Sequence, residues 1–231
     1  MFHNRINIVK INSPLLIGGC MLTQLRDILY LDPGHAFGLQ NRTNSFIQEN
    51  FTQIDQYMFD KVDLEPFKCL FFHDFIDQEY LYIHKEKIAS FLEKGRVVIF
   101  CGHLFKEWLP GCSLFTPKTI NSFADYTISK AIEHPIFEGV EPEDMTFNKG
   151  VAGFFARGTH SPVPSQAEVL LNLPGMPITY IDRNTTRGTI LVHAGRDLFS
   201  HRMQNKSTDR ISTQLLQWVQ DEFDSIRGEK Q

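Results

Sequence analysis

Residues 95–103 read Gly95-Arg96-Val97-Val98-Ile99-Phe100-Cys101-Gly102-His103, a β-branched and aromatic run that is bounded by glycines and closes on a thiol and an imidazole. The segment before it repeats apolar residues at helical spacing. An apolar run of this kind after a helix is typical of a buried strand in a parallel sheet. Because ligands bind outside the carboxyl ends of strands in open α/β sheets, the sequence predicts a site at Cys101, Gly102 and His103.

Two further segments place polar groups at the ends of predicted strands. An apolar strand over 68–72 runs into His73 and Asp74, and a strand over 189–195 contains His193 and is followed by Asp197. Parallel strands end at one edge of a sheet, so these side chains are expected to converge with Cys101 and His103 in one crevice.

The remaining pattern predicts alternating strands and helices. Asp77 is expected to cap a helix that ends at Lys94-Gly95, where a cationic residue and a glycine suit a helix C-terminus. Further expected elements are an edge strand at 5–11, a short strand at 15–19 with a glycine turn into a helix, a helix at 46–59, strands at 168–173 and 178–182, a turn at 184–188 and a terminal helix at 208–226.

Prolines and glycines interrupt the middle of the chain. They predict a long elaborated insertion around 104–165 without long regular elements, apart from short strands between 146 and 157. With 231 residues, of which 42% are hydrophobic, the chain is expected to form one domain over 1–231. The fold class predicted is α/β, with a mostly parallel but mixed sheet and helices on both faces.

Charge and cysteine usage narrow the class of protein. The formal net charge is -4 and the pI is near 6.1, and no Lys/Arg-rich run is present, so nucleic acid is not expected as a partner. The four cysteines form no CxxC pair and no regular disulfide spacing, which favours reduced thiols in a cytoplasmic protein. No apolar run approaches the roughly 18 residues that span a bilayer, so no membrane partner is expected.

The strand at 69–74, the passage from helix through Gly95 into Cys101-Gly102-His103, and the late run from Arg187 to Asp197 together resemble a known family. They are similar to the flavodoxin-like fold of the class I glutamine amidotransferase-like superfamily, nearest to its ThuA-like and other non-amidotransferase branches. The resemblance covers about two thirds of the chain. It implies a flavodoxin-like sheet with its site at the carboxyl edge.

Two departures from the family's motifs affect the activity that the resemblance implies. The amidotransferases carry G-x-C-x-G-[HQ] at the nucleophile turn, whereas Phe100-Cys101-Gly102-His103 lacks the first glycine and one spacing residue. The family's late His-Pro-Glu is replaced by His193-Ala194-Gly195, so the Cys-His-Glu triad has no glutamate. The resemblance therefore implies a domain without glutaminase activity that binds a small polar metabolite, as a binding protein or an accessory subunit.

The alternative class is a hydrolase of an amide, ester or glycan-derived substrate, either cysteine-dependent or metal-assisted. In the first form Cys101 attacks and His103 or His193 acts as the base. A free cysteine also packs well as a small core residue, and that interpretation stays open beside the catalytic one. The sequence lacks tight metal-ligand spacing such as H-E-x-x-H, so no metal site is predicted, and it identifies no cofactor.

Candidate ligand-binding residues surround the predicted crevice, and each has a structural alternative. Arg157 and His160 lie in a loop without an obvious core role, where functional residues concentrate, although Arg157 could equally anchor the loop through a salt bridge. Histidines at strand ends also hydrogen-bond loop carbonyls. The candidate set is His73, Asp74, Gly102, Arg157, His160 and Asp197.

Aromatic residues of the insertion leave a further choice. They could line an apolar pocket, form a partner surface or pack as a satellite core, and the chain has 20 phenylalanines, so their abundance singles out none of them. The apolar stripe of the terminal helix is expected in the core, with dimerisation as the alternative, so a homo-oligomer is left open. The aromatic and apolar residues of the insertion are Phe105, Trp108, Leu109, Phe154 and Phe155.

Glycine pairs at 18–19 and within 149–153 could bring backbone amides close to an anion, although such pairs usually mark tight turns.

Overall fold

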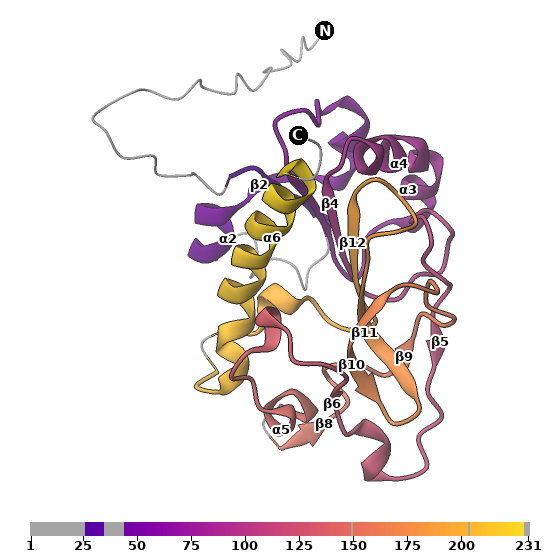
Figure 1. Ribbon diagram of the computed structural model, residues 1–231, viewed down its shortest axis with the longest axis vertical. Helices are drawn as coiled ribbons and strands as arrows, with labels where there is room; N and C mark the ends of the chain where they lie inside the picture. The colour runs from indigo at the N-terminus through magenta and orange to yellow at the C-terminus, as the bar shows by residue number, and fades with distance from the viewer. Residues whose placement is uncertain (1–25, 35–43, 149, 203, 229–231) are drawn as a thin grey trace, which may run out of the picture.

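The computed structural model describes residues 26–34, 44–148, 150–202 and 204–228, and these form an eight-stranded sheet covered by helices (Figure 1). The strand order is β2-β1-β3-β4-β12-β11-β10-β6. The first five strands pair in parallel and the last three in antiparallel fashion, which confirms an α/β fold with a mostly parallel, mixed sheet. Their bounds are β1 Ile28–Asp32, β2 Thr52–Asp55, β3 Cys69–Phe72, β4 Val97–Cys101, β6 Ser129–Lys130, β10 Glu168–Leu173, β11 Met176–Asp182 and β12 Thr189–His193.

The central strands are buried on both faces, as their uninterrupted apolar runs predict. Every residue of β3, β4 and β12 is buried. Successive side chains point to opposite faces of a strand, so Val97, Ile99 and Cys101 enter one core while Val98 and Phe100 enter the other.

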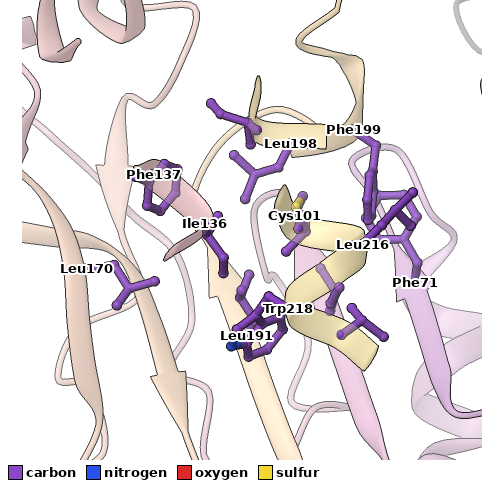
Figure 2. Close-up of a cluster of buried hydrophobic side chains, with 14 of the residues drawn as sticks. Phe71, Cys101, Ile136, Phe137, Leu170, Leu191, Leu198, Phe199, Leu216 and Trp218 are labelled. Atoms are coloured by element: carbon purple, nitrogen blue, oxygen red, sulfur yellow. The ribbon is translucent and has the colours of Figure 1, made fainter. Parts of the chain in front are cut away.

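Helices cover each of these cores. The helix α6 (Ile211–Gly228) and the short α2 (Ser45–Asn50) pack on the first face, where Leu216 and Trp218 of α6 belong to the same buried cluster as Leu191 and Cys101 (Figure 2). On the second face, α3 (Gln78–Ile83) and α4 (Lys85–Glu93) pack with residues 104–112. The sheet is therefore sandwiched between two helical layers.

The predicted helix at 77–93 forms with the expected ends but is divided. Asp77 caps α3 by accepting a hydrogen bond from the Tyr80 amide, and the chain leaves α4 through Lys94 and Gly95, whose φ is +72°. His84 separates the two helices, with φ −101° and ψ +16°. The apolar periodicity continues across this break, which is why the sequence predicts one element.

The predicted helix at 46–59 is wrong beyond its first turn. Helix α2 ends at Asn50, and residues 52–55 form β2, which pairs in parallel with β1 at the edge of the sheet. A 3-10 helix, η2 (Gln56–Lys61), follows. Sheet pairing satisfies the backbone of the 52–55 segment, so tertiary context outweighs a weak local helical pattern.

The region 104–165 contains only short elements. They are β5 (Thr116–Pro117), η3 (Phe123–Tyr126), β6, η4 (Pro135–Phe137), α5 (Pro142–Thr146), β7 (Phe147–Asn148), β8 (Val151–Ala152) and β9 (Gly158–Thr159). Apolar residues of this region, among them Ile136 and Phe137, join the core beneath α6 (Figure 2). The region thus packs onto the sheet instead of forming a separate core.

The chain returns to regular structure as the sequence predicts. Strands β11 and β12 form an antiparallel pair across the turn at 184–188, and the 3-10 helices η5 (Leu198–Ser200) and η6 (Ser207–Arg210) precede α6. The strands expected at 5–11 and 15–19, the glycine pair at 18–19, Cys20 and Lys149 lie outside the described residues. The helix expected after the strand at 15–19 is wrong at its carboxyl end, because Ile28 and Leu29 belong to β1, which pairs in parallel with β2 and β3.

Among the residues that the structure describes, no helix is both long enough and apolar enough to cross a membrane.

Candidate functional site

A cleft of about 520 Å³ opens at the carboxyl edge of the sheet, above β3, β4 and β12. It is lined by residues that directly follow these three strands, together with a loop that crosses from the 104–165 region. This is the edge where parallel sheets bind ligands, and the volume lies within the range of small-molecule sites. The lining residues are 74–76, 78, 102, 103, 105, 153–157, 195 and 196.

Gly195 holds the crossing loop against the end of β12. Ala156 and Gly195 form an isolated antiparallel bridge, and the Arg196 amide donates to the Phe155 carbonyl at 3.4 Å. A Cβ atom at position 195 would lie 1.8 Å from the Phe155 carbonyl oxygen, a distance that backbone atoms cannot tolerate. The glycine therefore brings Arg157 and Arg196 to the same cleft.

Gly102 fixes the turn after β4. Its φ is +146°, and a Cβ there would lie 3.1 Å from the Asp74 Cα atom. The Gly102 amide donates to the His193 carbonyl at 3.0 Å, which ties the turn to β12. This close packing sets Asp74 and His103 side by side in the cleft wall.

Arg157 and Arg196 supply positive charge to the cleft. Both side chains are exposed, and neither forms an ion pair with a described carboxylate. Arg157 Nε donates to the Gly153 carbonyl at 2.7 Å, and its guanidinium carbon lies 5.8 Å from the centroid of the Tyr126 ring. These contacts orient Arg157 without neutralising it, so the cleft carries two cations that a ligand anion can bind.

His103 presents a half-buried imidazole to the same cleft. Its ring stacks on Phe115 with a centroid distance of 3.7 Å and an interplanar angle of 16°. Its ring nitrogens form no hydrogen bond with the described residues. Burial lowers the pKa of His103 below 6.5, while the charge of Asp74 opposes that shift. A neutral imidazole with unused nitrogens can donate or accept a proton in the cleft.

Asp74 is held in the cleft wall by a buried histidine. His73 Nδ1 lies 3.2 Å from Asp74 Oδ1, and His73 Nε2 lies 2.8 Å from the Tyr30 hydroxyl. His73 is 2% exposed, whereas the Asp74 side chain is 27% exposed. The structure thus places Asp74 in the cleft and His73 behind it, as a residue that positions the carboxylate.

Cys101 does not reach the cleft. Its side chain is fully buried among Leu198, Phe199 and residues of α6 (Figure 2). Burial raises the pKa of this thiol well above 9.0, and the nearby Asp197 raises it further. Only a thiolate attacks, so this placement favours the packing role over the nucleophile role predicted for Cys101. Cys69 is also fully buried with a raised pKa, and burial raises the pKa of Cys112 to about 12.

Two predicted histidines anchor backbone beneath the cleft instead of lining it. His193 Nδ1 lies 2.7 Å from Thr179 Oγ1, and its Nε2 lies 3.2 Å from the Phe155 carbonyl oxygen. Burial lowers the pKa of His193 to about 3, so the ring is too weakly basic for the predicted role of general base. His160 lies 3.0 Å from the carbonyl oxygens of both Gly102 and Ser113, so it supports the cleft and is not positioned for the predicted ligand contact.

Asp197 is a buried carboxylate below the cleft. Its Oδ1 accepts a hydrogen bond from the Phe199 amide at 2.7 Å and caps η5, while its Oδ2 is buried without a hydrogen-bond partner among the described residues. Burial raises the pKa of Asp197 to about 6. Its predicted contact with a ligand is not favoured, because only 4% of the residue is exposed.

Sequence reasoning missed three residues that shape the cleft. Gln78 holds the 102–108 loop, since its Nε2 donates to the His103 carbonyl and its Oε1 accepts from the Phe105 amide, each at 2.7 Å. Phe75 lines the mouth with a positive φ of 68°, a conformation that favours glycine and is found at functional sites. Arg196 carried a usable signal, because it follows the strand end at His193 within three residues.

The aromatic residues of the insertion divide between core and cleft. Trp108 and Leu109 are buried and do not line the cleft, Phe155 is buried but lines it, and Phe105 and Phe154 are exposed and line it. Among the described residues, no group of three or more His, Cys, Asp or Glu side chains is placed to hold a metal ion.

Comparisons with protein-family models, with curated protein sequences and with solved structures give no match for this chain. Inference about function therefore depends on the chemistry of the cleft itself.

Proposed function

We propose that the chain is an amidotransferase-like α/β domain that binds a small anionic metabolite at the carboxyl edge of its sheet, without glutaminase activity, as a binding protein or an accessory subunit. The observation that carries this proposal is the pair of arginines. Arg157 and Arg196 line one cleft, and neither is paired with a described carboxylate. Arginine presents a planar fork of donors that suits carboxylate and phosphate groups.

The strand order supports the fold part of the proposal. Counted along the described chain, the five parallel strands follow the order second, first, third, fourth, fifth, as β2-β1-β3-β4-β12. This is the order of flavodoxin-like doubly wound sheets, which bind ligands outside the carboxyl ends of their strands. The cleft lies above three of these ends.

The chemistry of the strand ends supports the loss of glutaminase activity. A cysteine-dependent amidotransferase needs an ionisable thiol beside a histidine that a carboxylate orients. Here Cys101 is buried with a raised pKa, and His193 interacts with Thr179 and a backbone carbonyl. The polar groups that face the cleft, namely Asp74, His103 and the two arginines, suit binding better than acyl transfer through sulfur.

Calorimetric titration with inorganic phosphate and with malonate at low salt tests the proposal. Replacing Arg157 or Arg196 by Gln removes a charge-assisted contact, which corresponds to about a tenfold or larger loss of affinity. Arg187→Gln is the matched control, because Arg187 is exposed in the turn at the opposite end of β12. Equal weakening by all three substitutions would show non-specific attraction and overturn the proposal.

A hydrolase is the second candidate, and it is favoured by the His103 imidazole in the cleft, whose nitrogens form no hydrogen bond with any described residue and which lies near Asp74. In this activity His103 accepts a proton from water as the water oxygen attacks an ester or amide carbonyl carbon, and returns that proton to the leaving alcohol or amine as the bond to carbon breaks. The arginines would hold an anionic part of the substrate. The buried thiol of Cys101 takes no part in this form of the reaction.

Hydrolysis of p-nitrophenyl acetate tests this candidate. The expected result is a rate that falls by about a hundredfold in His103→Gln and rises with pH through the lowered pKa of His103. His84→Gln, which alters a half-buried histidine between α3 and α4, should leave the rate unchanged. A wild-type rate equal to the buffer rate would exclude this activity for simple esters.

A further inference from the structure

Exposed phenylalanines surround the cleft. Phe75 is 63% exposed, Phe105 is 65% exposed and Phe154 is 42% exposed, and all three line the same cavity. They come from three separate segments, after β3, after β4 and between β8 and β9. Large apolar side chains gathered around one opening mark a surface that binds something apolar.

The wall below these rings is also aromatic. His103 stacks flat on Phe115, and the ring of Phe105 lies edge-on to both, at centroid distances of 6.1 and 6.3 Å. Phe115 covers one face of the His103 ring, while His103 still lines the cleft. A planar ring entering the cleft would extend this stack through contacts with His103 and Phe105.

The two arginines of the cleft favour a ligand with an anionic group at the end away from its apolar part. Arg157 follows Phe154 by three residues, and Arg196 lies three residues beyond the end of β12, next to the bridge between Ala156 and Gly195. An anionic group held by these arginines would leave the rest of the ligand among the phenylalanines. A cavity of about 520 Å³ suits a small molecule rather than a flat protein surface.

We propose that the cleft selects aromatic acids, with a planar ring against Phe105, Phe154 and His103 and a carboxylate or phosphate on Arg157 and Arg196. This inference rests on the proposed function, since it names the class of anion that the site binds. Besides an anionic group, the ligand must then carry a planar aromatic ring.

Paired ligands that differ only in the ring test this requirement. Benzoate is compared with cyclohexanecarboxylate, and phenyl phosphate with cyclohexyl phosphate, by calorimetry on the full chain. The aromatic member of each pair should bind about threefold to tenfold more tightly, the range expected for a stacked aromatic pair. The better of the two aromatic ligands identifies carboxylate or phosphate as the preferred anion.

Substitutions of cleft residues test whether the preference for aromatic ligands arises in the cleft. Phe105→Leu and Phe154→Leu should bring each pair to nearly equal affinity, while Arg157→Gln should weaken both members equally. Phe123→Leu is the control, because Phe123 is 58% exposed but is not among the residues that line the cleft. Unchanged melting temperatures exclude loss of fold as the cause.

The outcomes separate this inference from the function on which it rests. Equal affinities within each pair in the wild-type protein would overturn the aromatic requirement and leave anion binding intact. A preference that persists in both leucine variants would also overturn it, because the ring would then bind elsewhere. Failure of all four ligands and of the simple anions to bind would overturn the proposed function as well.

Discussion

Asp197→Asn is expected to stabilise the protein at neutral pH and to change its stability little at pH 4. Asp197 is 4% exposed, its Oδ2 has no hydrogen-bond partner in the part of the chain that the structure describes, and burial raises its pKa to about 6 from 3.8. The charges that act on it are those of His73 and Arg202, which lower the pKa, and of Asp74, which raises it. Desolvation is the largest of these effects.

The sign follows from proton binding. Between pH 3.8 and about 6 the folded protein binds more protons at Asp197 than the unfolded chain does, so stability falls as pH rises through this window. The full shift corresponds to about 3 kcal/mol, since one pKa unit equals about 1.4 kcal/mol. Most of this difference should develop between pH 4 and pH 7.

The substitution keeps the shape and the Oδ1 acceptor that caps η5, and it removes the titration. Urea unfolding of the wild-type and variant proteins should therefore give a difference in unfolding free energy that grows by about 2.5 kcal/mol from pH 4 to pH 7. Because burial of the Asn side-chain amide costs the same free energy at both pH values, it does not contribute to this change between pH 4 and pH 7.

Asp144→Asn serves as the control of opposite sign. Hydrogen bonds from Ser207 lower the pKa of Asp144, so its carboxylate adds stability above its unfolded pKa, and its loss should destabilise more at pH 7 than at pH 4. A difference for Asp197→Asn that stays constant with pH would refute the argument, because the carboxylate would then be solvated or paired.

Three further predictions concern the same region. Burial lowers the pKa of His193 to about 3, so only the unfolded chain gains a proton at this residue as the pH falls below 6.5. The wild-type protein therefore loses stability between pH 7 and pH 5, and His193→Gln should reduce that loss by about 2 kcal/mol. Urea unfolding at both pH values measures the difference. Gly195→Ala should abolish anion binding in calorimetry, because it adds a Cβ against the Phe155 carbonyl. Gly175→Ala, which adds a Cβ into open space at φ +77°, should leave anion binding unchanged. Cys69 and Cys101 should resist DTNB in the native protein and react only on denaturation, and mass mapping of a rapidly labelled Cys101 would contradict its burial.

The parallel core of the fold could be predicted from the sequence because its strands are continuous apolar runs. The runs ending at Phe72, Cys101 and His193 are bounded by turn residues and helices, and these local signals agree with the final sheet. The 52–55 strand could not be predicted in the same way. It is a short edge strand whose exposure pattern depends on its partner β1, which local periodicity does not reveal.

The sequence predicts where the cleft lies better than it predicts which residues line it. Strand ends gave Asp74, Gly102 and His103, and the loop argument gave Arg157, all of which line the cleft. His160 and His193 share that edge, but their ring nitrogens interact with backbone carbonyls and, for His193, also with the Thr179 hydroxyl. Composition cannot distinguish such internally hydrogen-bonded histidines from histidines that bind a ligand. Arg196 could have been included, because it lies three residues after the strand end at His193. The bridge between Ala156 and Gly195 that brings the 153–157 loop beside it is a long-range contact that no local pattern encodes.

Binding of aromatic acids in the cleft is tested by soaking a crystal of the full chain with p-iodobenzoate, in which the anomalous signal of iodine locates the ring. We expect an iodine peak in the cleft beside Phe105 and Phe154, with the carboxylate density between Arg157 and Arg196. An iodine peak at another surface, or a ligand in the cleft whose carboxylate faces away from both arginines, would contradict it.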